Sequence, residues 1–254
     1  MALTKVGKEG ITGIDNSSDA TAITIDSSER VMIGTTTEGQ VSADDLTVAT
    51  SANTGITIRS GTASNGAIYF SDGTSGDDEY RGILDYDHND NKFRIYTDAV
   101  ERMRIDSTGA VTIPNQPAFY AETGSTQTDF GQSSTHTLAF SVERFDQNSD
   151  FASNNFTAPV TGRYFLHTTL RFESIDTAAT YYLWGFGTSN HDYFSIIDPK
   201  FSADVGYISV QQTVLADMDA NDTARVVFQQ VGGSQQTDLQ GAGGYSYFCG
   251  HLVC

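Results

Sequence analysis

The clearest structural signal in this sequence is the segment Phe156-Thr157-Ala158-Pro159-Val160-Thr161-Gly162-Arg163-Tyr164-Phe165-Leu166. Proline and glycine end a turn at Gly162, where a larger side chain would crowd the chain. From there the side chains alternate, so that Tyr164 and Leu166 share one face of an extended strand and Phe165 lies on the other. The segment therefore predicts a turn followed by a β-strand.

The same pattern extends over the whole second half of the chain. Runs of alternating apolar and polar residues are separated by Gly, Asn, Asp and Ser, which are typical turn residues, and no helical period interrupts them. The predicted strands are Pro117 to Ala121, His136 to Phe140, Gly162 to Phe172, Ala178 to Gly187, Tyr193 to Ile197, Gly206 to Ala216, Asp222 to Val231 and Gly244 to Val253. Residues 117–254 are therefore expected to form an all-β sandwich or jelly-roll head.

The first half has a different composition. It is rich in Ser, Thr, Gly, Asp and Ala, contains no aromatic residue before Tyr69, and contains no proline before Pro114. Pro114 and Pro117 mark the border, because proline removes a ladder hydrogen bond and disfavours helix in the residue before it. Residues 114–116 are predicted to be a short, stiff linker.

An internal repeat organises the first half. The stretch from Ile23 to Ile33 recurs from Met103 to Ile113, with the same Ile-Asp-Ser before the centre and the same Val-x-Ile at the end. Each copy has the pattern of a β-hairpin. Further short alternations predict strands at Leu46 to Val48, Ile56 to Ile58, Ala67 to Phe70, Ile83 to Tyr86 and Phe93 to Tyr96.

The first half has few large apolar side chains. A single copy of it would therefore bury too little apolar surface to offset the conformational entropy that the chain loses on folding. Residues 21–113 are therefore predicted to form an intertwined, homo-oligomeric β stalk that shares its core between chains. Residues 1–20 have two open interpretations, a flexible low-complexity linker or an attachment segment.

Charge and hydropathy exclude several classes of protein. The formal net charge of −18 repels polyanions, so nucleic-acid binding is not expected. No window is long and apolar enough to predict membrane insertion, and residues 1–10 lack the apolar core of a secretory signal. Cys249 and Cys254 would point to opposite faces of a strand, which argues against a mutual disulfide and a metal pair.

The second half resembles the complement 1q/tumour-necrosis-factor superfamily. The spacing from Phe156 through Gly162 and Tyr164 matches the family signature, an acidic turn at residues 217–222 precedes the penultimate strand, and residues 248–252 resemble the closing strand. The signature residues are Phe156, Gly162, Tyr164, Leu166, Phe248, Gly250 and Leu252. The resemblance implies a jelly-roll head that forms tight trimers around an axis lined with aromatic and apolar residues.

The first half is similar to repeats of tailed-bacteriophage fibre proteins, particularly those of marine and cyanobacterial phages. The fragments that carry this resemblance are Val31 to Thr36 and Met103 to Ile113. Together the two resemblances imply a short virion fibre: a homotrimer assembled in the host cytoplasm, in which residues 1–20 attach to another tail or capsid protein, residues 21–113 form the stalk and residues 117–254 form the head.

No arrangement of catalytic residues is evident. The sequence contains no Gly-x-Ser-x-Gly elbow, phosphate loop or His-Glu-x-x-His motif, and its histidines have no pair at ligand spacing. His167 and His251 are interpreted as ordinary partly buried or interface residues. We therefore expect a protein that is not an enzyme and has no cofactor. A glycan depolymerase remains an alternative, because paired carboxylates need not be close in the chain.

Two Asp-rich stretches, residues 85–90 and 217–222, resemble the start of a calcium loop. Each lacks the glycine at the sixth position and the glutamate at the twelfth, where Tyr96 and Phe228 stand. Both are interpreted as hairpin turns. No metal site is predicted, and weak calcium binding at the trimer axis, where three copies of one carboxylate converge, is kept as an alternative.

The head also has candidate binding loops. Successive loops of an antiparallel sandwich alternate between its two ends, so the loops at residues 173–177, 198–205 and 232–243 should share the end far from the stalk. They are polar and glycine-rich, as recognition loops often are, although plain solvated loops are the alternative interpretation. The candidate receptor-binding residues are Glu173, Asp176, Asp198, Lys200, Gln235, Gln236 and Asp238.

The sequence thus predicts a short tail fibre whose trimeric head binds a host-surface glycan or protein. The main alternative is a structural or decoration fibre in which the head only drives trimerisation. A secreted ligand of the complement or necrosis-factor type is a third hypothesis, which the missing signal peptide and the fibre-like stalk disfavour.

Overall fold

The computed structural model describes residues 23–254, which divide into two compact units, one ending at Gly66 and one beginning at Ala67. The attachment segment expected at residues 1–20 lies outside the described residues. Apart from the short 3-10 helix η1 (Gly76–Tyr80), all the regular structure is β, which confirms the predicted all-β class. Within the described residues, no helix has the length and hydropathy needed to cross a membrane.

The first unit holds a three-stranded sheet of β1 (Ile23–Ile25), β2 (Val31–Ile33) and β3 (Leu46–Val48). β1 and β2 form the predicted hairpin, in which Ile23 pairs with Ile33, and β3 adds in parallel to β2. The prediction of a strand at residues 56–58 is wrong: these residues form no strand, and both isoleucines are exposed.

The two sequence repeats adopt the same turn. Asp26 Oδ1 accepts hydrogen bonds from the backbone N–H groups of Ser28 and Arg30, at 2.8 and 3.1 Å. Asp106 Oδ1 accepts the equivalent pair from residues 108 and 110, at 2.8 and 3.0 Å. The fourth turn residue has a positive φ in both copies, 66° at Glu29 and 88° at Gly109. The shared Asp thus specifies one hairpin turn twice.

The second unit begins with a five-stranded antiparallel sheet. Its strands, in order, are β4 (Asn65–Phe70, which starts at the unit border), β5 (Gly82–Asp87), β6 (Lys92–Thr97), β7 (Val100–Ile105) and β8 (Val111–Thr112). Among residues 67–113, no apolar side chain is fully buried. The Arg94 guanidinium instead lies over this sheet and binds Asp85 and Asp87, each at 2.9 Å.

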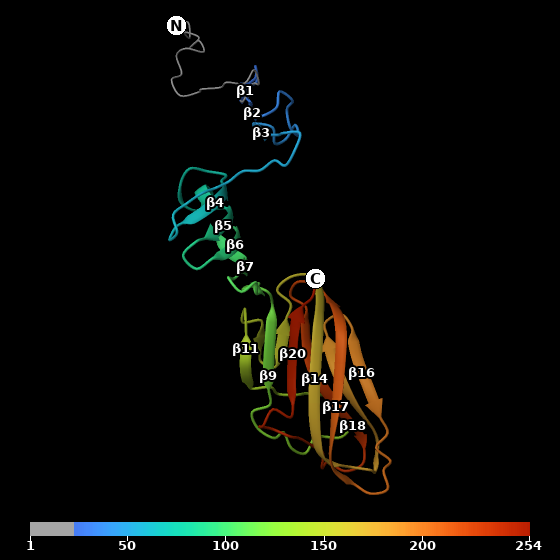
Figure 1. Ribbon diagram of the computed structural model, residues 1–254. Coiled ribbons are helices and arrows are strands. Elements are labelled where there is room, and N and C mark those ends of the chain that lie inside the picture. The colour runs from blue at the N-terminus through green and yellow to red at the C-terminus, as the bar shows by residue number, and fades with distance from the viewer. Residues whose placement is uncertain (1–22) are drawn as a thin grey trace, which may run out of the picture. The chain divides into compact units, whose positions relative to one another are not determined.

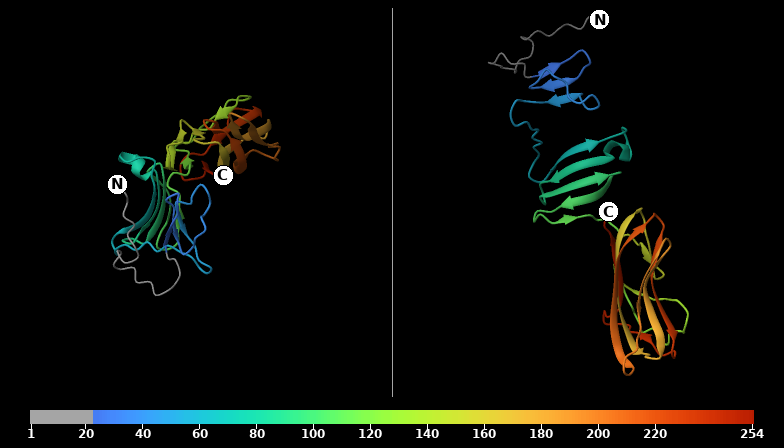
Figure 2. Two further views of the ribbon diagram at one scale, coloured as in Figure 1. Left: turned by 90° about the horizontal axis from the view of Figure 1, so that it is seen from above. Right: turned by 90° about the vertical axis from the view of Figure 1, so that its right-hand side faces the viewer.

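The rest of the second unit is the head, a sandwich of two antiparallel sheets (Figures 1 and 2). The sheet that faces the viewer in Figure 1, here called the front sheet, has the order β11 (Val142–Asp146), β9 (Ala118–Glu122), β20 (Tyr247–Leu252), β14 (Gly162–Ile175) and β17 (Val205–Met218), with β19 (Asp238–Leu239) also paired to β14. The back sheet has the order β12 (Phe151–Ala152), β13 (Asn155–Thr157), β18 (Thr223–Gly232), β15 (Ala179–Thr188) and β16 (Asp192–Ile197), with β10 (His136–Thr137) paired to β18.

Aromatic rings fill the space between the two sheets. The Phe119 ring centroid lies 4.8 Å from that of Phe156 on the back sheet and 4.8 Å from that of Phe248 on the neighbouring front-sheet strand. All three rings are buried. Tyr164 packs against Phe156 and donates its hydroxyl proton to the Val160 carbonyl at 2.7 Å, so its polar atom is satisfied.

The single tryptophan of the chain belongs to this core. Trp184 lies on β15 and is 8% exposed. Its indole N–H donates to the backbone carbonyl of Gln211 on β17, at 3.3 Å. This bond links the back sheet directly to the front sheet.

Every strand predicted for the head overlaps an observed strand, but the structure has others that the sequence did not indicate. β11, β12, β13 and β19 are short, and their apolar residues are too few to set a period. The predicted strand from His136 to Phe140 is shorter in the structure, because only His136 and Thr137 pair with β18.

We expect Gly250→Ala to destabilise the head by about 1–3 kcal/mol, because overpacking a full core forces its neighbours apart. A Cβ at this position would lie 2.8 Å from Leu166 Cδ2, 2.9 Å from Phe119 Cε1 and 2.9 Å from the Phe165 carbonyl oxygen. The measurement is urea unfolding followed by Trp184 fluorescence. Gly206→Ala is the matched control, since its Cβ would meet nothing within 4 Å. Equal stability of the two variants would contradict the packing argument.

Candidate functional site

The three loops predicted to share one end of the head do meet there, at the carboxylate of Asp204. Asp204 Oδ1 accepts hydrogen bonds from the backbone N–H and the hydroxyl of Thr177, at 2.9 and 2.6 Å, and Oδ2 accepts one from Gln236 Nε2 at 3.4 Å. These bonds hold the pKa of Asp204 below its usual value, with the Thr177 hydroxyl the largest cause. We call this region the loop end.

Asp176 does not have the surface position expected of a receptor-binding residue. It is 3% exposed, and its carboxylate accepts hydrogen bonds from the Ala178 N–H at 2.8 Å, from the Ser234 N–H, and from the Ser234 hydroxyl at 3.0 Å. Gln230 Nε2 donates to the same carboxylate at 3.5 Å. The Asp176 side chain can be buried here because backbone and side-chain donors surround it, so Asp176 positions the loops instead of being presented to a partner.

Four other predicted residues lie at the surface in two separate places. Lys200 Nζ lies 3.2 Å from Asp198 Oδ2 on the loop before β17, and both side chains are exposed. The second place is around Asp129. Gln235 Nε2 donates a hydrogen bond to the Asp129 carbonyl at 2.5 Å, and Asp238 Oδ1 accepts one from the Asp129 N–H at 2.8 Å. The loop that contains Asp129 therefore belongs to the loop end, although the sequence did not indicate it.

The seventh predicted residue, Glu173, lies beside a group of side chains that the sequence did not indicate as a site. Glu173 Oε1 lies 3.1 Å from Arg171 Nη2 on the outer face of the front sheet. The guanidinium carbon lies 4.7 Å from the Tyr207 ring centroid and 4.5 Å from that of Tyr245. We call Arg171, Tyr207 and Tyr245 the tyrosine clamp. Each of these three residues lies just outside one of the three predicted loops. A search that included the residues flanking the loops could have found the tyrosine clamp.

Beyond the clamp, the central part of the outer face of the front sheet carries no charged side chain, whereas Glu122 and Arg144 form an ion pair at its β9–β11 edge. Between Arg163 and Arg171 on β14, and between Tyr207 and Asp217 on β17, every outward residue is uncharged. We call the part of this surface that begins beyond Ser209, away from the clamp, the neutral face; it consists of Ala118, Tyr120, Phe165, His167, Thr169, Gln211, Thr213, Leu215, Tyr247, Cys249 and His251.

The centre of the neutral face is aromatic and partly buried within a single chain. The Tyr120 and Tyr247 rings stack with centroids 5.0 Å apart, and the His167 ring centroid lies 5.6 Å from that of Tyr247. His167 Nδ1 lies 2.7 Å from Thr213 Oγ1. Burial lowers the pKa of His167 and raises the pKa of the Cys249 thiol, so both groups favour their neutral forms.

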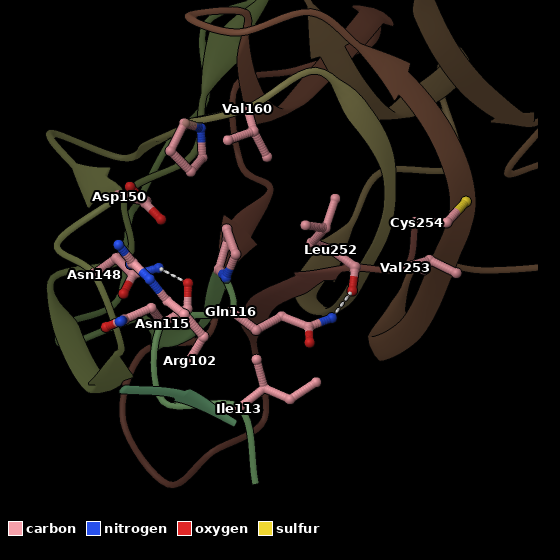
Figure 3. Close-up of a pocket in the computed structure, with 12 residues that line it drawn as sticks. Arg102, Ile113, Asn115, Gln116, Asn148, Asp150, Val160, Leu252, Val253 and Cys254 are labelled. Carbon is pink, nitrogen blue, oxygen red and sulfur yellow. Dashed lines mark hydrogen bonds between the residues drawn. The ribbon is translucent and has the colours of Figure 1, made fainter. Parts of the chain in front are cut away.

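A cavity of about 600 Å³ lies where the five-stranded sheet joins the head (Figure 3). Ile113, Val160 and Leu252 give it apolar walls, and Gln116 Nε2 donates to the Leu252 carbonyl at 2.6 Å. Asp150 is the one carboxyl side chain among its lining residues, and burial raises its pKa. The cavity therefore lacks the pair of carboxylates that glycoside hydrolysis requires.

Both Asp-rich stretches considered as calcium loops form turns. The first is the β5–β6 connection, where Asp87 Oδ1 accepts from the Asn89 N–H at 2.9 Å. In the second, Asp222 accepts from the Ser189 hydroxyl at 2.7 Å and from the Asp219 N–H at 2.7 Å. Over residues 23–254, no group of three or more His, Cys, Asp and Glu side chains is arranged to hold a metal ion.

Among solved structures, the chain is similar to the globular domain of zebrafish complement 1qA protein, with 18% sequence identity, coverage of 55% of this chain and 98% of that chain, and a TM-score of 0.39. It is also similar to murine APRIL, with 9% identity, coverage of 55% and 100%, and a TM-score of 0.41. No protein-family model and no curated protein matches the chain.

We expect Asp176→Ala to cost about 1–3 kcal/mol, because it leaves several buried donors without an acceptor. Hydrogen–deuterium exchange should show faster exchange at residues 232–236, which contain the Ser234 N–H that this carboxylate accepts. Asp198→Ala is the control, since its side chain is exposed and its one ion pair is weak. Unchanged exchange in the Asp176 variant would show that the carboxylate does not hold the loop.

Proposed function

We propose that this chain is a homotrimeric structural fibre protein whose head binds a cell-surface receptor at its loop end. The observation that carries the proposal is the neutral face: an uncharged, aromatic surface on a chain with a net charge of −18. Interface cores are depleted in charged residues and enriched in aromatic ones. Copies this acidic repel one another, and a contact surface without charge adds no like-charge pairs at close range to that repulsion.

A second apolar patch offers the neutral face a partner. Phe194 and Ile196 are 40% and 63% exposed on β16, at the edge of the back sheet, and Leu183 lies beside Ile196 on the same face. The two patches differ, so contact between them is heterologous and generates a ring if the rotation closes. The resemblance of the head to the complement 1q/tumour-necrosis-factor superfamily supports three copies in that ring.

The region before the head supports the same assembly. Met32 is the one fully buried apolar side chain among residues 23–66, and residues 67–113 have none. Ile68, Tyr69 and Phe70 on β4 are instead exposed in the single chain. Apolar strands without a core gain stability when other copies cover them, so we propose that residues 21–113 share a core in a trimeric stalk.

The wider role follows from the resemblance of the stalk to tailed-bacteriophage fibres. We propose a virion protein that binds another tail or capsid protein through residues 1–20 and is not an enzyme. Asp176 and Asp204 hold the loops in place, and a rigid loop loses little entropy on binding. This supports a role of the loops in recognition and not only as connections between strands. Three copies would also turn a weak site into avid attachment. In the alternative, the head only drives trimerisation of a decoration fibre.

Light scattering on the full chain tests the assembly. We expect a mass of about 82 kDa, three times the 27.4 kDa of the chain. Phe165→Arg places a charge in the centre of the neutral face and should give monomers, whereas Thr180→Arg adds the same charge to an exposed position outside it and should not. Far-UV circular dichroism checks that both variants remain folded. A wild-type monomer, or a trimeric Phe165→Arg variant, would overturn the proposed interface.

Acidification should destabilise the folded head. Burial lowers the pKa of His167 from its usual 6.5, so the folded head binds this proton less readily than the unfolded chain, and the stability that neutral His167 contributes is lost as the pH falls from 6.5 toward the lowered pKa. The measurement is the urea midpoint, followed by Trp184 fluorescence, against pH between about 5 and 8. His167→Gln should reduce the dependence on pH, and an equal dependence in the wild type and the variant would contradict the role of His167.

A further inference from the structure

We propose that the tyrosine clamp is the recognition element of the loop end and that its ligand is a neutral saccharide. This inference rests on the proposed adhesive function and specifies its ligand. The clamp lies outside the residues suggested by the loop sequences and at the opposite end of β14 from the centre of the neutral face, since Glu173 pairs with Tyr207 whereas Phe165 pairs with Leu215. Self-association and ligand binding therefore use different parts of one sheet.

The clamp is a built arrangement. Arg171 is held from its backbone, because its N–H donates to the Ser246 hydroxyl at 3.0 Å and its carbonyl accepts from the Gln240 N–H at 2.9 Å. The guanidinium lies within cation–π distance of both rings, and Glu173 binds its edge. Tyr207 lies on β17 and Tyr245 lies in the bend just before β20, and the guanidinium holds both rings in place before any ligand arrives, which lowers the entropic cost of binding.

The two rings are exposed although they are ordered. Tyr207 is 67% exposed and Tyr245 is 51% exposed, so much of each ring remains open to solvent while the guanidinium lies against it. Large aromatic side chains held at the surface supply apolar contact area at little further entropic cost. The C–H groups on one face of a sugar ring are weakly positive and pack on the negative face of an aromatic ring.

The surroundings of the clamp provide hydrogen-bonding groups for sugar hydroxyls. Ser209 pairs with Arg171 on the neighbouring strand and is exposed, and Asp238 on β19 pairs with Glu173. Carboxylates accept hydrogen bonds from hydroxyl groups, and the serine hydroxyl both donates and accepts. Aromatic faces bordered by such groups match a ligand that has an apolar ring face and a polar edge.

Charge favours a neutral saccharide over an acidic one. The Arg171 charge is paired with Glu173, so the clamp offers no free cation to an anionic sugar. The chain carries a net charge of −18, which repels sialylated, uronic or sulfated glycans at long range. A neutral sugar is unaffected by this field.

The first experiment measures binding of the labelled full chain to an array of neutral hexose, deoxyhexose and N-acetylhexosamine oligosaccharides, with sialylated oligosaccharides and polylysine as other probes. We expect binding to neutral members only. Tyr207→Ala and Tyr245→Ala should each weaken it about tenfold, and Tyr207→Phe should retain it because the ring face remains. Tyr86→Ala, which removes an exposed tyrosine of the five-stranded sheet, is the control and should bind as wild type. All variants should keep the wild-type mass.

Binding only to sialylated probes or only to polylysine would overturn the proposal, and so would neutral binding that is unchanged in Tyr207→Ala and Tyr245→Ala. Binding of the labelled chain to a panel of bacterial cells separates this inference from the adhesive function. Binding lost after periodate oxidation of the cells supports both. Binding lost after protease but not after periodate keeps adhesion and overturns the saccharide. Binding to the neutral array without binding to any cell keeps the clamp and overturns adhesion.

Discussion

The missing side chain at Gly250, on the inner side of the front sheet, is the constraint on which the packing of the head depends. The missing side chain lets Leu166 and Phe119 pack directly against the backbone of β20. Phe119 can then contact Phe248 in its own sheet and Phe156 in the opposite one. A side chain at this position would displace Phe119, whose ring reaches Phe156 in the opposite sheet.

The core also decides what the outer surface displays. On β14, Tyr164 and Leu166 face inward, so Phe165 and His167 must face outward, and the same alternation brings Arg171 to the surface. A shift of one residue in the register would exchange the two sets. The packing of the core therefore determines both the neutral face and the position of the tyrosine clamp, although the core touches no partner.

Much of the architecture could be predicted from the sequence because it rests on local patterns. Alternation located the long strands, the repeated Asp-Ser turn located both hairpins, and antiparallel geometry placed three loops at one end. What could not be predicted depends on partners distant in the chain. Asp176 is buried because Ser234 and Gln230 surround it, and Arg171 meets Tyr207 and Tyr245 only after three strands have paired. Residues 56–58 were predicted as a strand but form none, because an alternating pattern forms a strand only where a neighbouring strand supplies hydrogen bonds.

The bond from Trp184 to Gln211 has a practical consequence for spectroscopy. Trp184 is the only indole in the chain, and it lies between the two sheets of the head. Its emission therefore reports on the head alone, while the strands of residues 23–113 contribute no tryptophan signal. A change in circular dichroism that leaves the emission maximum in place would belong to those strands, so two optical signals can follow the two regions of one unlabelled chain separately.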